Sequence, residues 1–265
     1  MSFTDWLFEA EGFVNPPISG QWKFLHIMTL VLCALTIIAF YFMVKKSNNK
    51  EKLKKIIIIT LVSLILFFEV ASRIVYIVRL YYYHDPYMNG TGMKWIMLPK
   101  PWCAISCWVL MISVLVRKKF FYNYASLSAL LCAIIFFVYP GVGYNNKYIM
   151  FSNLYSIVTH ALLLITSITL IVFKYTEFKY KNLWKVMICF ALTVAYALLQ
   201  IYVLKIHHDP LYFMPNGDIQ AGILRMNWGI YITLYCLFIL VYINTFYLIE
   251  DKQTLKTIFS KNKKQ

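Results

Sequence analysis

One cysteine stands where helix geometry would make a thiol reactive. The segment Leu98–Ser106, with the sequence LPKPWCAIS, places two prolines shortly before Cys103. Proline interrupts a regular helix, so we expect a helix to begin at Trp102 and to carry Cys103 in its first turn. The free N–H groups and the positive dipole end at that point, together with the nearby cation of Lys100, favour a thiolate over a thiol. The spacing therefore predicts an activated nucleophile.

Five more polar side chains fall in the outer parts of apolar segments: Glu69, Arg73, His160, Tyr196 and Gln200. Counting along each helix places Cys103 and Glu69 about 10 Å below the outer face of a hydrocarbon core about 30 Å thick. His160 comes out about 13 Å and Tyr196 about 12 Å below that face. Because a polar residue within a membrane span costs free energy, it commonly faces the bundle interior or marks a site. We interpret Cys103 and His160 as the candidate reactive groups.

Each of these residues also has a purely structural explanation. A histidine in a membrane helix often only bonds to a neighbouring helix. Glu69 and Arg73 are four residues apart on one helix face, where they can neutralise one another. The sequence leaves this pair open between that structural role and a role in orienting His160 or binding a lipid headgroup.

The elements that must position these residues are membrane spans. Of the 265 residues, 61% are hydrophobic and 14% are charged, and apolar runs of about 20 residues match the thickness of a bilayer. The sequence therefore predicts an all-α polytopic membrane protein, a bundle of seven transmembrane helices. The third span is helical only from Trp102, so it is shortened at its outer end. The predicted spans are Phe24–Val44, Ile56–Leu80, Ile96–Val116, Phe120–Tyr139, Phe151–Phe173, Trp184–Val203 and Met226–Leu248.

The net charge of +15 has a topological explanation. Lysine and arginine gather in the first, third and fifth loops and in the C-terminal tail, and such an excess of cations is typical of cytoplasmic segments. The pattern predicts an N-terminus outside and a C-terminus inside, and it argues against a nucleic-acid partner. We expect an interfacial segment at 1–23, a transmembrane domain at 24–249 and a basic cytoplasmic tail at 250–265. The Lys-, Ile- and Tyr-rich usage fits an AT-rich bacterial genome and hence a bacterial cell membrane.

Two loops share the phrase His-Asp-Pro, at 84–86 and at 208–210, and we interpret both as turns. The alternatives are a distant duplication of the spans and a zinc site, since histidine and carboxylate are zinc ligands. The candidate zinc ligands are His84, Asp85, His207, His208 and Asp209. No pair of histidines at helical spacing supports them, so we expect no metal and no cofactor. All six cysteines lie in apolar spans, which does not indicate a disulfide framework.

Two segments resemble a known family. Leu98–Ser106 looks like the Leu-Pro-Leu-His-Leu-Cys-x-Ile-Ser segment of the YwaF-like bacterial membrane proteins, which belong with the transmembrane protein 164 acyltransferases. Ser152–Leu163 is similar to the family segment Phe-Phe-x-Ser-His-Gly/Ala-x-Leu, which also stands in the fifth span. The chain departs from the family at the histidine before the cysteine, which is Trp102 or Pro101 here, and at Thr159, where the family has serine. The family's later Asn-Tyr-rich segment is replaced by the second His-Asp-Pro loop.

The resemblance implies an acyl-transfer enzyme of lipid metabolism, with Cys103 as nucleophile and His160 as base. We expect it to move a fatty acyl group through a thioester between membrane phospholipids and lysolipids of the outer leaflet, and water as acceptor would make it a lipid hydrolase. The residues expected to bind the substrate are Glu69, Arg73, Lys100, Tyr196 and Gln200. The alternative is a non-enzymatic seven-helix transporter or carrier with a polar outward-facing cavity, which would also need polar groups in the cytoplasmic half, where the spans have few.

Overall fold

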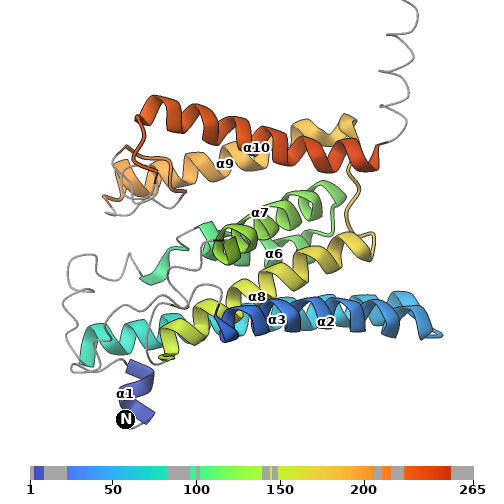
Figure 1. Cartoon of the computed structure of the whole chain (residues 1–265), viewed down its shortest axis with the longest axis horizontal. Coiled ribbons are helices and arrows are strands. Elements are labelled where there is room, and N and C mark those ends of the chain that lie inside the picture. Colours follow the sequence, from blue (N-terminus) through green and yellow to red (C-terminus); the bar gives the residue numbers. More distant parts are fainter. Residues whose placement is uncertain are drawn as a thin grey trace, which may run out of the picture. The chain divides into compact units, whose positions relative to one another are not determined.

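A computed structural model describes residues 3–8, 23–82, 96–99, 102–138, 144, 149–205, 211–215 and 224–251. In these ranges every regular element is helical, as the all-α prediction requires. The longer elements are α2 (Phe24–Lys46), α3 (Lys50–Tyr82), α6 (Trp102–Val116), α7 (Lys119–Val138), α8 (Phe151–Val172), α9 (Leu183–Leu198) and α10 (Trp228–Glu250) (Figure 1). The shorter ones are α1 (Phe3–Phe8), the 3-10 turn η1 (Tyr180–Asn182) and the π-helical turn η2 (Leu199–Val203).

The seven predicted spans each correspond to a helix. Within the described ranges, six helical segments are long and apolar enough to cross a membrane, and Trp102–Val116 is a shorter apolar helix. The third helix begins at Trp102 and has 15 residues, as its proline-rich approach predicts. The main differences are at the ends. Helix α3 begins at Lys50, six residues before the predicted Ile56, because Lys54 and Glu51 pair at 2.7 Å and allow the helix to continue out of the apolar region.

The chain forms two compact units. The first comprises residues 1–117 and 125–175, and the second comprises residues 118–124 and 176–265. Within the first unit α8 is the central element, because it packs against α2, α3 and α6. Figure 1 shows α2, α3 and α8 running alongside one another. The predicted division into an interfacial segment, a transmembrane domain and a tail stays a prediction.

The short helix α1 rests on the first unit. It packs against α3 and α8, and the indole N–H of Trp6 donates to the carbonyl oxygen of Ile149 at 2.8 Å. The Trp6 ring meets Phe151, at the start of α8, edge-on with centroids 5.8 Å apart. This aromatic contact places α1 at the N-terminal end of α8.

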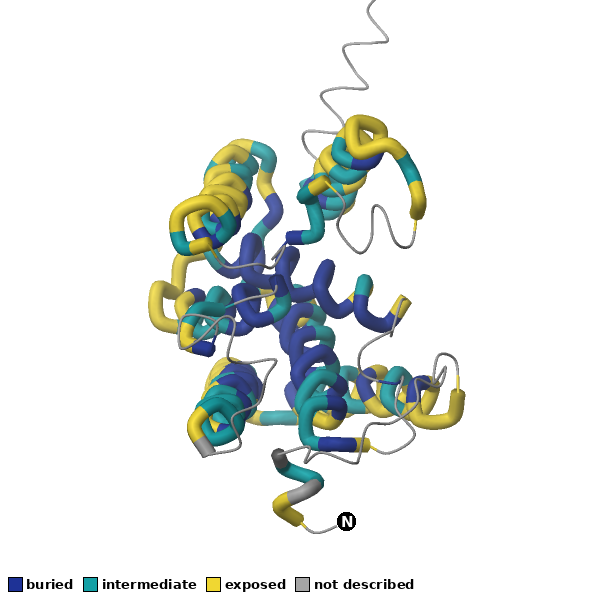
Figure 2. Tube along the Cα trace, turned by 90° about the vertical axis from the view of Figure 1, so that its left-hand side faces the viewer, coloured by how far each residue is buried: buried dark blue, intermediate teal, exposed yellow. Residues whose placement is uncertain are grey.

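Large apolar side chains cover the outer faces of several helices. In the most apolar windows of α2 and α10 only 11% of the residues are buried, and side chains such as Leu32, Leu35, Phe238 and Val241 are exposed. Figure 2 marks such exposed stretches in yellow. So much exposed apolar surface is unfavourable in water but not in contact with lipid tails. The backbone polar groups of a helix bond to one another, so these helices need no water to satisfy them.

A buried chain of polar groups ties the start of α6 to α7. The indole N–H of Trp102 donates to the hydroxyl of Ser128 at 2.9 Å, and the hydroxyls of Ser128 and Ser106 are 2.7 Å apart. Ser106 also lies 3.4 Å from the sulfur of Cys132. A buried polar group without a hydrogen-bond partner is costly. These contacts therefore keep the first turn of α6 from sliding along α7.

In the second unit, Asn123 joins the start of α7 to the segment that precedes α9. Its side-chain amide donates to the carbonyl oxygen of Glu177 at 2.7 Å, and its side-chain oxygen accepts from the Glu177 N–H at 2.8 Å. The Glu177 carboxylate in turn pairs with Lys179, and this bond lowers the pKa of Glu177. The two backbone bonds hold this connection in a single conformation.

Replacing Asn123 with leucine is expected to lower the free energy of unfolding by about 2 kcal/mol, because it leaves a backbone N–H and a carbonyl of Glu177 without their partner. Denaturant titration in detergent micelles measures the change. The matched control is Thr245→Ala, which removes only an exposed hydroxyl that bonds to Val241 within the same helix. Equal stabilities for the two variants would contradict this role of Asn123.

Candidate functional site

Cys103 occupies the first turn of α6, where its predicted helix start places it. Its side chain is partly exposed. The backbone N–H groups of Cys103 and Ala104 lie close enough to the sulfur to interact with it. Because these N–H groups belong to the first turn of the helix, where no carbonyl of a preceding turn accepts from them, they are free to stabilise negative charge at or beside the sulfur.

Cys103 differs in accessibility from the thiols around it. Cys107, one turn further along α6, and Cys132, on α7, are close enough to Cys103 for electrostatic interaction. Both of them are buried, as is Cys33, so Cys103 is the accessible thiol of the first unit.

His160 is held in one orientation by two contacts. Its Nδ1 lies 2.7 Å from the carbonyl oxygen of Ser156, and a carbonyl only accepts, so Nδ1 carries the proton. The ring stacks on Phe136 of α7 with centroids 3.8 Å apart and an interplanar angle of 7°. With the proton on Nδ1, the neutral imidazole has its lone pair on Nε2. Among the described residues no hydrogen-bond donor or acceptor occupies Nε2, which leaves this nitrogen available as a base.

Contacts with α7 relate the positions of Cys103 and His160. Cys103 is close enough to Cys132 for electrostatic interaction, and Phe136, which stacks on His160, stands four residues from Cys132 on the same helix. Four residues correspond to about 6 Å along a helix axis. Since α6 also packs against α8, the helices that carry the thiol and the imidazole are in contact with each other.

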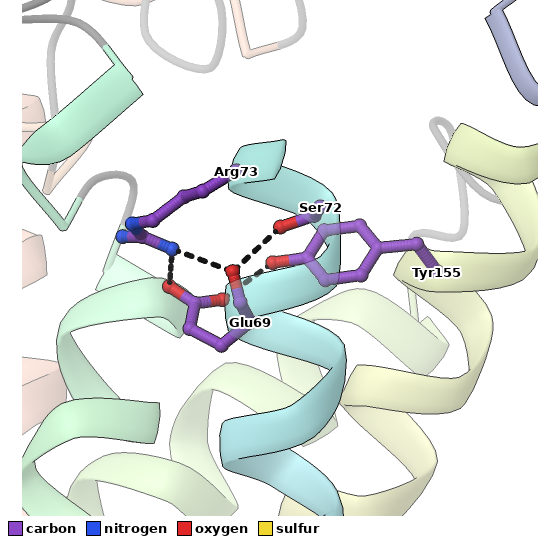
Figure 3. A network of polar contacts seen from close by, with 4 residues as sticks. All are labelled: Glu69, Ser72, Arg73 and Tyr155. Carbon is purple, nitrogen blue, oxygen red and sulfur yellow. Dashed lines mark hydrogen bonds and ion pairs between the residues drawn. The ribbon is translucent and has the colours of Figure 1, made fainter. Parts of the chain in front are cut away.

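Glu69 is the centre of a buried polar network (Figure 3). Its carboxylate accepts from Arg73 Nη1 at 2.6 Å and from the hydroxyl of Tyr155 at 2.6 Å. Its backbone carbonyl accepts from the same Nη1 and from the hydroxyl of Ser72, both at 3.0 Å. The Glu69 side chain is 1% exposed. The carboxylate is also close enough to Cys103 to interact with it electrostatically.

Of the roles that the sequence leaves open for Glu69 and Arg73, the structure shows the ion pair, and the binding of a lipid headgroup stays a prediction. The two side chains form an ion pair, and the bond that orients His160 comes from the Ser156 carbonyl instead. Tyr155 belongs to α8 and Glu69 to α3, so their bond also ties these two helices together at the level of the site.

The sequence profile of the TMEM164 family matches residues 19–249. The chain belongs to the TMEM164 family. No curated protein and no solved structure matches it. Together with the apolar helices, this membership makes the chain an integral membrane protein. The matched range includes the thiol, the imidazole and the Glu69 network of this TMEM164-family protein.

The other predicted site residues of this TMEM164-family protein lie in the second unit or outside the described residues. Tyr196, on α9, and the buried Gln200, in the π-helical turn η2, belong to the second unit. Their predicted place in the same layer as Cys103 stays a prediction. Lys100 lies outside the described residues, as do all five candidate zinc ligands, His84, Asp85, His207, His208 and Asp209. Across the described ranges no group of three or more His, Cys, Asp or Glu residues could hold a metal ion.

Two residues of the first unit are not singled out by the patterns considered in the sequence. Tyr155 resembles any aromatic residue of a membrane helix, and only its contact with Glu69 distinguishes it. His26 is fully buried near the start of α2, where its ring lies against Phe137 and Tyr144 with centroids 6.0 and 4.9 Å away. An ionisable side chain inside an apolar span is itself a signal of a buried polar role, and this signal could have found His26.

Proposed function

We propose that this protein is a membrane-embedded lipid acyltransferase that uses Cys103 as nucleophile and His160 as general base. The observation that carries the proposal is a pair of groups in one unit. One is an accessible thiol at a helix N-terminus, and the other is an imidazole whose Nδ1 proton is held by Ser156. Covalent acyl transfer requires a nucleophile and an oriented base, and these two residues supply one of each.

In the first half of the reaction, the Cys103 sulfur attacks the carbonyl carbon of an acyl ester and Nε2 of His160 accepts the thiol proton. The carbonyl oxygen becomes an oxyanion, which the N–H groups of Cys103 and Ala104 stabilise. The intermediate then expels the alkoxide of the donor lipid. That oxygen takes the proton from the imidazolium, which leaves a lysolipid and an acyl thioester on Cys103.

The second half reverses these steps with a different alcohol. The hydroxyl of a lysolipid gives its proton to Nε2 of His160 and attacks the thioester carbonyl. The new ester forms as the Cys103 sulfur leaves and recovers the proton. With water in place of the alcohol, the same steps release a free fatty acid, so the accessibility of the site to water decides between transfer and hydrolysis.

The charge pattern supports an N-terminus outside and a C-terminus inside, and the Lys-, Ile- and Tyr-rich composition supports a bacterial cell membrane. In that orientation the first turn of α6 lies in the outer half of the bilayer. Acyl-coenzyme A is confined to the cytosol, so the acyl donor that fits this position is a phospholipid of the outer leaflet.

The thioester itself provides the decisive test. Purified protein in lipid nanodiscs receives a phospholipid with an isotope-labelled acyl chain, and peptide mass mapping locates the adduct. We expect the label on Cys103 alone, released by neutral hydroxylamine. Labelling of none or of all six cysteines would overturn the proposal. If the protein is instead a transporter, it would move a lipid between the leaflets or a solute across the membrane, and no adduct would form.

His160→Ala is expected to slow formation of the thioester by at least about 10²-fold, the contribution of a positioned general base. The measurement is the rate at which labelled acyl chain appears on Cys103. His26→Phe is the matched control, because it keeps a ring in the second buried histidine position and should leave that rate unchanged. A similar loss in both variants would indicate that the histidines act only through packing.

A further inference from the structure

Arg73 uses only part of its guanidinium in the ion pair with Glu69. Both contacts to Glu69 come from Nη1, one to the carboxylate and one to the backbone carbonyl. Guanidinium has five N–H donors, and the buried Nε makes no hydrogen bond. Among the described residues Nη2 has no partner either. The edge formed by Nε and Nη2 is therefore open in the sense that no described group bonds to it, and this edge is the fork that binds a phosphate or carboxylate through two parallel bonds.

The open edge is held in place by its surroundings. The guanidinium lies over the ring of Trp108, 5.6 Å from its centroid, and the Arg73 side chain is 14% exposed. An arginine inside a membrane span is costly and typically faces an interior path or a ligand. With one face against Trp108 and Nη1 bonded to Glu69, the Nε–Nη2 edge is oriented before any ligand arrives.

We propose that the Nε–Nη2 edge of Arg73 binds the phosphodiester of the lipid whose acyl chain Cys103 receives. This inference rests on the proposed function, and it adds a requirement for a phosphate on the donor. It makes Arg73 the residue that distinguishes a glycerophospholipid from a neutral diacylglycerol with the same acyl chains.

The groups lie close enough together for one glycerophospholipid to reach them. Glu69 is close enough to Cys103 for electrostatic interaction, and Arg73 lies four residues further towards the C-terminal end of α3, about 6 Å along the axis. With the predicted orientation this direction leads to the outer surface. In a glycerophospholipid the phosphate lies on the water side of the ester carbonyls, separated from them by the glycerol carbons. Since Arg73 Nη1 is 2.6 Å from the Glu69 carboxylate, a lipid with its phosphate at Arg73 has its ester carbonyls in the region of Glu69 and Cys103.

The test compares the affinities of the purified full-length protein for dioleoylphosphatidylglycerol and for dioleoylglycerol in nanodiscs of neutral lipid. Arg73→Lys keeps the charge and a bond to Glu69 but removes the fork. We expect it to weaken phosphatidylglycerol binding about tenfold and to leave dioleoylglycerol binding unchanged. The matched control is Arg79→Lys, on the same helix, which should change neither affinity.

A second variant changes the affinity in the opposite direction. Glu69→Gln removes the competing carboxylate and leaves Arg73 with an uncompensated positive charge, so phosphatidylglycerol should bind more tightly than to the wild type. A purely structural pair would not produce this gain. Equal effects of Arg73→Lys on both lipids, or unchanged affinity in both variants, would overturn the proposal.

Two further comparisons separate the alternatives. If inorganic phosphate binds the wild type as tightly as phosphatidylglycerol does, and Arg73→Lys weakens both equally, the ligand is free phosphate and the lipid assignment is overturned. Affinities are measured on the Cys103→Ser variant as well, so binding does not depend on catalysis. An Arg73-dependent preference for phosphatidylglycerol without any thioester on the wild type would support the phosphodiester site while contradicting the acyltransferase.

Discussion

Replacing Cys103 with serine is expected to lower the rate of acyl transfer by about 10⁴-fold or more, the scale seen when an enzyme loses its nucleophile. Serine has nearly the same shape, so the protein should remain folded. Its hydroxyl, however, has a far higher pKa than a thiol and attacks an ester poorly without strong activation. The measurement is the transfer of a labelled acyl chain from phospholipid to lysophospholipid in nanodiscs.

The neighbouring thiols provide the controls for this prediction. Cys107→Ser and Cys132→Ser alter buried sulfurs close to Cys103 and leave the nucleophile in place. Both variants should retain most of the activity and form the thioester on Cys103. If serine at position 103 leaves the rate unchanged, or if all three variants lose activity together, Cys103 is not the nucleophile.

Replacing Arg73 with methionine is expected to lower the free energy of unfolding by about 3–5 kcal/mol, because it leaves the Glu69 carboxylate buried without a cation. Glu69 is 1% exposed, and its one other side-chain partner in the network is the hydroxyl of Tyr155. A single neutral hydrogen bond compensates little of the cost of burying a charge. Denaturant titration in detergent micelles measures the loss.

Two comparisons show whether the loss comes from the uncompensated charge. In the double variant Glu69→Gln with Arg73→Met no charge is buried, so much of the lost stability should return. Lys54→Met breaks an ion pair of similar length, 2.7 Å, whose carboxylate on Glu51 is 81% exposed, and it should cost less than about 1 kcal/mol. A double variant no more stable than Arg73→Met would show that the loss comes from packing against Trp108.

Features that depend on neighbouring residues along the chain could be predicted from the sequence. The start of α6 at Trp102 follows from two prolines, because a proline lacks the N–H that a helix interior needs. The number of long apolar helices follows from apolar runs that match the bilayer, and the ion pair of Glu69 with Arg73 follows from their spacing on one helix. The candidate nucleophile and the candidate base were identifiable for the same reason, since both are unusual residues at a calculable depth.

Contacts between helices could not be predicted from the sequence, because the depth of a residue along its helix does not determine the direction in which its side chain points. Only packing decided that Tyr155 reaches Glu69, that Phe136 stacks on His160, and that the Ser156 carbonyl holds Nδ1. The π-helical turn that contains Gln200 is also a tertiary result, since no residue of that stretch demands a wider turn. In an apolar span nearly every face can be buried, so the composition of a helix does not identify the helices that pack against it. The site is therefore defined by side chains that meet only in the folded structure.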